Sequence, residues 1–207
     1  LNGTLVTGAT SATWTFTPAS TGSDSVSIRI NDAAGAQAIS NTVTITVNMA
    51  PTVGISPSAT VIDVGQSQLF TSSVTGGTLP LAYQWCLNGT VVSGASGSSW
   101  TFTPNSTGLY TVYLNVTDNV GVRAKSNTAS IAVNPAPSVS ISPASAVLDV
   151  GQSKQFNSTI SGGSSPYYYQ WYLNSAPVSG ATGLTWTFTS TSAGTYSLYV
   201  NVTDGVG

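Results

Sequence analysis

The feature that most constrains this chain is an internal repeat with a strict period of 86 residues. Each copy contains a tryptophan that opens a Trp-Thr-Phe-Thr segment, at Trp14, Trp100 and Trp186. An aspartate three residues before a glycine recurs at the same spacing, at Asp32, Asp118 and Asp204. A fixed period of this length indicates a tandem array, in which one structural module is used again and again.

The period also predicts the domain organisation. The 207 residues hold two full periods and part of a third. We expect residues 1–48 to be the C-terminal part of one module, 49–134 to be a complete module, and 135–207 to be a module without its last strand. Either this stretch is a window on a longer array, or another chain completes the last module.

The composition argues against several classes of function. Charged residues make up 5% of the chain, against about 25% in ordinary soluble domains. The four cations are scattered, so we expect no nucleic-acid binding, which needs clustered positive charge. No run of apolar residues reaches the roughly 18 of a membrane span, so we expect no membrane insertion within this segment. The 62 serines and threonines predict a polar, nearly uncharged surface.

Catalytic groups are equally sparse. The chain has no histidine, no glutamate and one cysteine, and its six aspartates do not cluster in sequence. Because general acid-base catalysis and covalent catalysis need such groups close together, we expect no enzyme, no catalytic residue and no cofactor. Ca²⁺ prefers six to eight oxygen ligands, so one aspartate per turn predicts no metal site. We expect the aspartates Asp63, Asp118, Asp149 and Asp204 to accept backbone N–H bonds in turns.

Alternating apolar and polar residues predict β-strands throughout. The segment Tyr110–Val116 alternates in this way, and Tyr196–Val202 repeats the pattern. Glycine and proline interrupt such runs at short intervals, and no stretch has helical periodicity. The pattern is typical of an all-β fold, in which each module is an antiparallel β-sandwich.

At this point the residues resemble tandem immunoglobulin-like and polycystic-kidney-disease-like (PKD-like) repeats of prokaryotic, in particular archaeal, cell-surface or filament proteins. Tyr83-Gln84-Trp85 resembles strand C of such a sandwich with its buried tryptophan, and Gly108–Val112 resembles a tyrosine corner. Residues Tyr110–Asp118 resemble the end of a PKD-like repeat. Two features depart from the families: Val112 and Ser72 stand where antibody domains carry cysteines, and Trp85–Gly89 replaces the Trp-Asp-Phe-Gly-Asp segment of PKD repeats.

The resemblance implies tandem immunoglobulin-like sandwiches whose aromatic side chains replace the missing disulfide in the core. The predicted core residues are Trp14, Trp85, Trp100, Trp171, Trp186, Tyr110 and Tyr196. The linkers Asn48–Pro51 and Asn134–Pro137 are short and contain proline, which restricts its own φ and the conformation of the residue before it. We therefore expect consecutive modules to form a rod with limited bending.

Two sets of surface residues are candidate sites. Asn-X-Ser/Thr sequons, which are N-glycosylation acceptors in exported proteins, occur at Asn2, Asn88, Asn105, Asn115, Asn157 and Asn201. A strip of outward-facing side chains on neighbouring strands is a possible contact face for another subunit, formed by Cys86, Tyr113, Tyr172 and Tyr199. The alternative for the strip is ordinary cross-strand pairing of surface side chains.

These observations predict a non-enzymatic structural segment of an extracellular filament, stalk or surface-layer protein, on the cell surface. Its expected partners are copies of itself and covalent N-glycans. Two alternatives remain open: an adhesin or glycan-binding module, for which Tyr167–Tyr169 is the best candidate, and accessory domains of a secreted enzyme.

Overall fold

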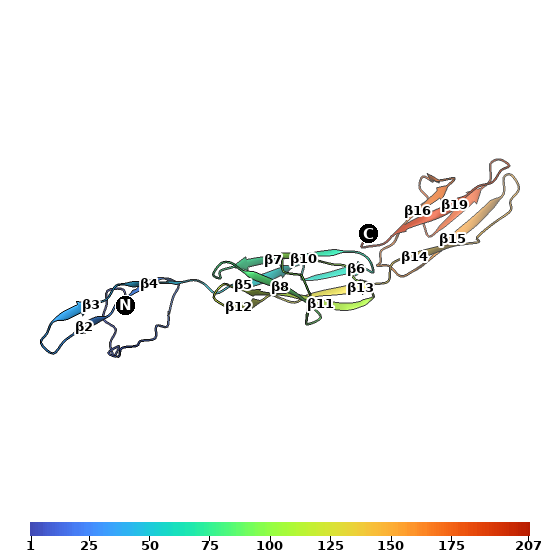
Figure 1. The fold of residues 1–207 in the computed structure, drawn as a ribbon. Coiled ribbons are helices and arrows are strands. Elements are labelled where there is room, and N and C mark those ends of the chain that lie inside the picture. Colours follow the sequence, from blue (N-terminus) through green and yellow to red (C-terminus); the bar gives the residue numbers. More distant parts are fainter.

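A computed structural model describes residues 1–207 as an all-β chain of nineteen strands without a helix. Three groups of strands follow one another end to end along an extended molecule, in the order of the sequence (Figure 1). The predicted fold class, tandem immunoglobulin-like β-sandwiches, is confirmed. The three groups are called here the first, second and third modules, with the residue ranges 1–48, 49–134 and 135–207.

The second module is a complete sandwich of two sheets. One sheet has the strand order β10-β7-β5, and the other has the order β6-β13-β11-β8-β9, with β12 beside β11. The strands are β5 (Thr52–Ser56), β6 (Ala59–Asp63), β7 (Gln68–Thr75), β8 (Ala82–Leu87), β9 (Thr90–Val91), β10 (Ser99–Phe102), β11 (Gly108–Thr117), β12 (Arg123–Lys125) and β13 (Ala129–Asn134). All pairs are antiparallel except β13 with β6, which is parallel.

Strand alternation places the core of the second module between these sheets. In β11 the residues Val112, Leu114 and Val116 are fully buried, and the residues between them face outward. They pack with the fully buried Phe70 and Trp85. Burying one such side chain stabilises a fold by roughly 1.5–3 kcal/mol, which is how this core holds together without a disulfide.

The third module repeats this layout with fewer paired strands. Its sheets have the orders β14-β15-β18 and β17-β16-β19. The strands are β14 (Ser138–Ser142), β15 (Ser153–Ser161), β16 (Tyr168–Leu173), β17 (Ala176–Pro177), β18 (Thr185–Thr189) and β19 (Leu198–Thr203). Residues 145–149, which correspond to β6, form no strand here.

The first module consists of two hairpin-like sheets, β1-β4 and β2-β3. Its strands are β1 (Gly22–Val26), β2 (Arg29–Asn31), β3 (Gln37–Ile39) and β4 (Val43–Val47). No residue of this module falls in the buried class. It is therefore a sheet fragment without a closed core.

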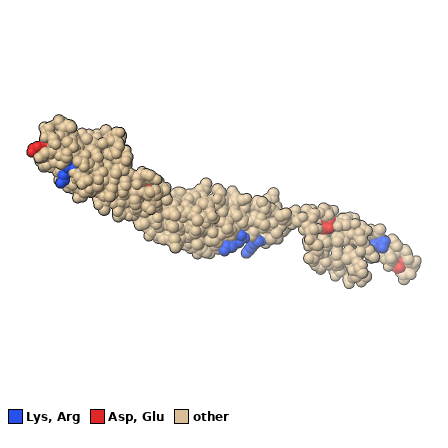
Figure 2. Space-filling view, turned by 180° about the vertical axis from the view of Figure 1, so that it is seen from behind, with Lys and Arg blue, Asp and Glu red and all other residues tan.

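Charged side chains occupy only a few isolated places on the face shown in Figure 2, and the rest of that face is uncharged. Serine and threonine supply much of the polar surface, as expected from the composition. As to membranes, the structure offers no helix with the length and hydropathy needed to cross a bilayer.

Candidate functional site: the joints and exposed faces

At the joint between the first and second modules, the linker is hydrogen-bonded to the second module. The Gly77 N–H donates to the Met49 carbonyl at 2.7 Å, and Asn48 Nδ2 donates to Thr78 Oγ1 at 2.9 Å. Gly76 has φ +71°, and a Cβ there would lie 2.5 Å from the Ala50 carbonyl oxygen. Glycine is needed at this position because the linker backbone lies directly against it.

The joint between the second and third modules repeats these contacts 86 residues later. The Gly163 N–H donates to the Pro135 carbonyl at 2.6 Å, and Asn134 Nδ2 donates to Ser164 Oγ at 2.8 Å. A Cβ at Gly162 would lie 2.5 Å from the Ala136 carbonyl oxygen. The repeat therefore encodes a linker that is pinned to the module that follows it.

An aspartate organises the turn at the same end of each of these modules. Asp118 accepts backbone N–H bonds from Thr78 at 3.1 Å, Val120 at 3.1 Å and Val122 at 2.8 Å. Desolvation of Asp118 raises its pKa, but these N–H donors stabilise the carboxylate more strongly, so the net pKa is lowered. The predicted turn role of Asp118 is confirmed.

Asp204 holds the matching turn of the third module. It accepts the backbone N–H groups of Ser164 at 2.7 Å, Val206 at 3.2 Å and Gly207 at 3.1 Å. A side-chain hydrogen bond from Asp63 and these backbone donors lower its pKa, against the opposing effect of desolvation. Asp204 is therefore held as a carboxylate, and its turn role is also confirmed.

Asp63 behaves differently from the prediction that it accepts backbone N–H bonds in its own turn. It lies at the end of β6 and is 2% exposed, because the third module covers it. Ser164 Oγ donates to Asp63 Oδ1 at 3.0 Å, while Asp63 Oδ2 is buried without a donor. The prediction was wrong because the side chain crosses the joint. Its counterpart Asp149 is exposed, and its side chain has no such contact.

Most predicted core aromatics lie in the interior. Trp85 and Trp171 are fully buried, and each indole N–H donates to a backbone carbonyl at 2.9 Å, of Gly97 and Gly183 respectively. The half-buried side chains of Trp100, Trp186, Tyr110 and Tyr196 pack against these cores. The Tyr110 hydroxyl donates to the Ser106 carbonyl at 3.0 Å, which is the bond that a tyrosine corner implies.

Trp14 is an exception, because it is 42% exposed. Its counterpart Trp100 packs against Trp85, with ring centroids 6.2 Å apart. No residue of the described chain corresponds to Trp85 in the first module, so Trp14 touches only Phe16 among the aromatics, at 5.9 Å. The assignment of Trp14 to a core is therefore wrong for this structure.

The strip of side chains predicted as a contact face is exposed in one module and not in the other. The predicted neighbours are confirmed: Cys86 faces Tyr113, and Tyr172 faces Tyr199, in the strand register. Cys86, however, is 1% exposed, because its small side chain lies beneath Tyr113, whose ring is in turn covered by Lys125 Nζ at 3.9 Å from its centroid. A continuous exposed strip through Cys86 is thus excluded.

In the third module the same face is aromatic and accessible. Tyr172 replaces the cysteine and stacks on Tyr199, with centroids 4.7 Å apart and an interplanar angle of 5°. Tyr199 is 41% exposed, and Tyr168 on the same strand face as Tyr172 is 62% exposed. Of the Tyr167–Tyr169 run, Tyr168 alone projects to solvent, since Tyr169 packs against the core and the Tyr167 hydroxyl donates to the Gly162 carbonyl.

The six sequon asparagines differ in how free their amides are. Asn105, Asn157 and Asn201 are exposed. Asn2 is engaged on both sides, since its Nδ2 donates to Asp24 Oδ1 at 2.8 Å and its Oδ1 accepts the Ser25 N–H at 2.7 Å.

The two remaining sequon asparagines have one contact each. Asn88 Oδ1 accepts the Thr111 N–H at 2.8 Å. Asn115 is half-buried, with Nδ2 against Cys86 Sγ at 3.7 Å, because it lies on the face that Tyr113 and Lys125 cover. The sites most open to modification are therefore Asn105, Asn157 and Asn201.

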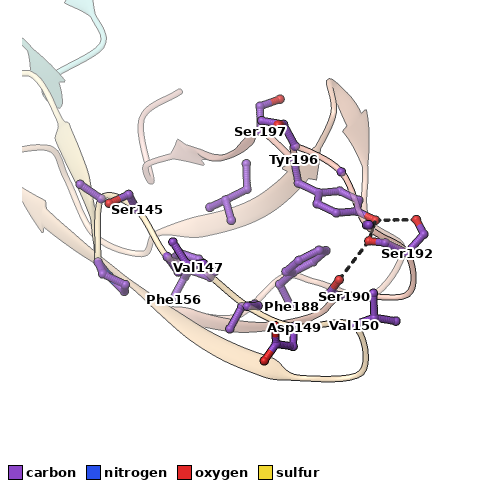
Figure 3. Close-up of a pocket in the computed structure, with 18 of the residues that line it drawn as sticks. Ser145, Val147, Asp149, Val150, Phe156, Phe188, Ser190, Ser192, Tyr196 and Ser197 are labelled. Atoms are coloured by element: carbon purple, nitrogen blue, oxygen red, sulfur yellow. Dashed lines mark hydrogen bonds between the residues drawn. The ribbon is translucent and has the colours of Figure 1, made fainter.

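A groove of about 710 Å³ opens in the third module between residues 143–150 and 192–198. Figure 3 shows Phe156 and Phe188 at its floor and Tyr196 on its wall, with the Tyr196 hydroxyl bonded to Ser192. The corresponding segments of the second module, 59–63 and 108–112, both pair with β13. The groove is thus the space that a β13-like strand fills in the second module.

No group of three or more aspartate and cysteine side chains converges in a way that would hold a metal ion.

The residues that cross the joint were not identified as a site from the sequence. The signal that could have found them was the repeat itself, because Asn48, Gly76, Gly77 and Thr78 return as Asn134, Gly162, Gly163 and Ser164.

The geometry described above defines the class of protein: a tandem array of immunoglobulin-like β-sandwiches whose linkers are hydrogen-bonded to the module that follows. More particularly, residues 52–131, within the second module, match the family model of the PKD domain.

Other similarities are weaker. The "highly immunogenic outer capsid protein" of Enterobacteria phage T4 is 27% identical over 130 residues, which cover 58% of this chain and 34% of that protein. The chain therefore matches about a third of that relative's length.

Two solved structures resemble the chain. Fibronectin(III)-like modules of Clostridium thermocellum CbhA align with a TM-score of 0.41 at 18% identity, covering 74% of this chain and 86% of theirs. The eight N-terminal immunoglobulin domains of Down Syndrome Cell Adhesion Molecule isoform 1.30.30 align with a TM-score of 0.37 at 20% identity, covering 77% of this chain and 23% of theirs.

Proposed function

We propose that this chain is a structural repeat segment of an extracellular filament, stalk or surface-layer protein on the surface of an archaeal cell. The observation that carries the proposal is the joint: each linker is hydrogen-bonded to the following module, so the modules lie end to end. An array of such modules acts as a spacer between its two ends, and this role requires no catalytic site. This is a mechanical role rather than an enzymatic one.

The relatives support a surface location. PKD and immunoglobulin-like modules are structural units, and the phage T4 relative is described as an outer capsid protein. The uncharged, hydroxyl-rich surface also suits an exterior, because its solvation changes little with pH or salt. We infer that copies of this protein assemble with one another through the free sheet edges of their modules.

N-linked glycans on the surface are part of the same proposal. Asn105, Asn157 and Asn201 are exposed, and a glycan at any of them would extend into solvent without disturbing a buried contact. Mass spectrometry of the protein from its native source would identify the modified asparagines. We expect glycans at these three sites and an unmodified Asn2, whose amide is engaged on both sides. Bare asparagines at all three sites would contradict this part of the proposal.

Pulling single molecules from both ends tests the mechanical role. A complete module of 86 residues has an extended length of about 300 Å, so its cooperative unfolding should release somewhat less than that length in one step. We expect a separate step for the second module, at a higher force than the unfolding of the two small sheets of the first module. A chain that extends smoothly without a discrete step would contradict a mechanical role.

A second function is favoured by one observation. Tyr172 stacks on Tyr199 on the third module, and exposed Tyr168 lies four residues before Tyr172 on the same face of β16. Sugar rings bind through apolar contact with such aromatic side chains. A glycan panel probed with the protein and with a Tyr172→Ala, Tyr199→Ala variant distinguishes the two functions. Binding that is lost in the variant supports an adhesin, while no binding by either protein supports a purely structural segment.

A further inference from the structure

The second joint contains a pair of carboxyl groups whose burial the proposed structural role does not explain. Asp63 of the second module is 2% exposed and Asp204 of the third module is 4% exposed. Ser164 links them across the joint, because its Oγ donates to Asp63 Oδ1 at 3.0 Å and its backbone N–H donates to Asp204 Oδ2 at 2.7 Å. Two ionised carboxylates that share one serine in a buried interface would repel each other, and one proton on the pair would replace that repulsion with an O–H donor facing a carboxylate.

The hydrogen-bond partners decide which aspartate carries the proton. Asp204 accepts three backbone N–H groups, and such donors stabilise the ionised form. Asp63 receives a single hydroxyl, from Ser164, and its Oδ2 is buried without any donor. An unpartnered, buried oxygen is costly as an acceptor, but as an O–H group it can donate to the Asp204 carboxylate.

The other side chains around Asp63 are uncharged. They are Ser164 and, through it, Asn134, together with Gln66, whose Nε2 donates to the backbone oxygen of Gly207 at 2.6 Å. Asp204 is the charged group that acts on Asp63. No cation therefore compensates a second negative charge at this interface.

We propose that the joint is a proton-linked clasp, in which one proton shared by Asp63 and Asp204 holds the second and third modules in the docked arrangement. When water removes that proton from Asp63 Oδ2, two anions face each other in a dry interface and the joint opens. Because Asp149 occupies the position of Asp63 in the next repeat, each joint between two such modules of a longer array would carry the same device.

The pH range of the clasp follows from the sign of each shift. Burial and the neighbouring Asp204 raise the pKa of Asp63, so its contribution to docking is present at low pH and is lost as the pH rises through that raised pKa. The bond from Asp63 and the backbone donors lower the pKa of Asp204, so its contribution is lost as the pH falls through that lowered pKa. The docked arrangement should be most stable at a pH between the lowered pKa of Asp204 and the raised pKa of Asp63, and it should become less stable above the pKa of Asp63.

The test measures the distance between the second and third modules as a function of pH. Nitroxide labels on cysteines introduced at the exposed positions Val91 and Leu184, in a Cys86→Ala background, report this distance and its spread by pulsed electron paramagnetic resonance. The whole 207-residue chain is used, and melting curves confirm that every variant is folded. We expect a narrow distribution at mildly acidic pH that broadens severalfold in width as the pH is raised.

Two variants separate the clasp from other effects of pH. In Asp63→Asn the amide donates permanently to Asp204, so we expect the distribution to stay narrow at every pH above the lowered pKa of Asp204. Asp149→Asn is the matched control, 86 residues away at an exposed site. Its distance distribution should broaden with rising pH as that of the unsubstituted protein does.

Three results would overturn the proposal. They are a distribution in the unsubstituted protein that does not change with pH, a broadening that persists in Asp63→Asn, and a narrow state that depends on added Ca²⁺ and disappears with a chelator. The last result would assign the pair to a cation instead of a proton.

Discussion

The second and third modules carry the same repeat, yet their side chains at matched positions are buried to different degrees. Ile55 and Ile62 are buried in the second module, whereas their counterparts Ile141 and Leu148 are only half-buried in the third. The difference follows β13, which pairs with both β6 and β11 and closes the second sandwich. Local sequence therefore defines which face of a strand is apolar, but the neighbouring strand decides whether that face is buried.

The same lesson holds at the joints. Asp63 and Asp149 lie at equivalent positions, and only Asp63 has a following module docked against it. The linker contacts, by contrast, are the same at both joints, because they need nothing beyond the linker and the module that follows. Matched substitutions 86 residues apart can test which properties belong to the repeat and which to its surroundings.

The largest effect is expected from the buried tryptophans. Trp85→Ala should reduce the free energy of unfolding of the second module by about 3–5 kcal/mol, because Trp85 is fully buried. Trp171→Ala should lower the transition of the third module instead. Calorimetric unfolding of the whole chain separates the two transitions. Trp14→Ala is the control, and its exposed side chain predicts a change within about 0.5 kcal/mol. An equal loss for Trp14→Ala would contradict the account.

A second substitution would make the second module resemble the third. Ile131 of β13 is fully buried, so Ile131→Ala should cost about 2–5 kcal/mol of stability in that module. Ile45 is its counterpart in β4 and is half-buried, so Ile45→Ala should cost clearly less. Denaturant titration of both variants provides the measurement. If the two losses were alike, closure by β13 would not explain the difference between the modules.

The glycine at the joint offers a comparison within one module. Gly162→Ala combines a left-handed φ of +71° with a Cβ 2.5 Å from the Ala136 carbonyl oxygen, whereas Gly180→Ala has φ +74° and open space. Both should lose about 1 kcal/mol of stability from the backbone strain, and Gly162→Ala should in addition displace the linker. Small-angle X-ray scattering should then show a more flexible chain for Gly162→Ala alone. Equal flexibility in both variants would count against the pinned linker.

The smallest effect is expected at the tyrosine corners, which should behave alike. Tyr110 and Tyr196 donate to the Ser106 and Ser192 carbonyls at 3.0 and 2.9 Å. Replacing either tyrosine by phenylalanine removes one partly exposed hydrogen bond, so each module should lose about 0.5–1.5 kcal/mol. Thermal melting of the two single variants checks the equality. A large loss in one module alone would show that the corner depends on β13.

Much of this fold could be predicted from the sequence. Period-2 alternation in Tyr110–Val116 and the aromatic residues around Trp85 fix the strand type and the core, because both depend on local pattern. The exposure of Trp14 and the burial of Cys86 could not be predicted in the same way. They depend on which neighbour covers each side chain, and Lys125 over Tyr113 is such a neighbour.

The joint was the hardest part to predict, for the same physical reason. Asp63 and Ser164 are about a hundred residues apart in the chain, and their hydrogen bond forms only when two modules dock. A single module gives no sign of it. The spacing of the repeated Asn, Gly-Gly and Ser/Thr residues carries that information, provided that the repeat is interpreted as a set of joints as well as a set of cores.

The most direct test of the central claim is cryo-electron microscopy of the protein in its native assemblies. The account predicts filaments or surface arrays in which successive modules keep one fixed orientation, with sugar density at Asn201. Isolated flexible rods, with module orientations that vary from particle to particle and bare asparagines, would contradict a structural role built on fixed joints.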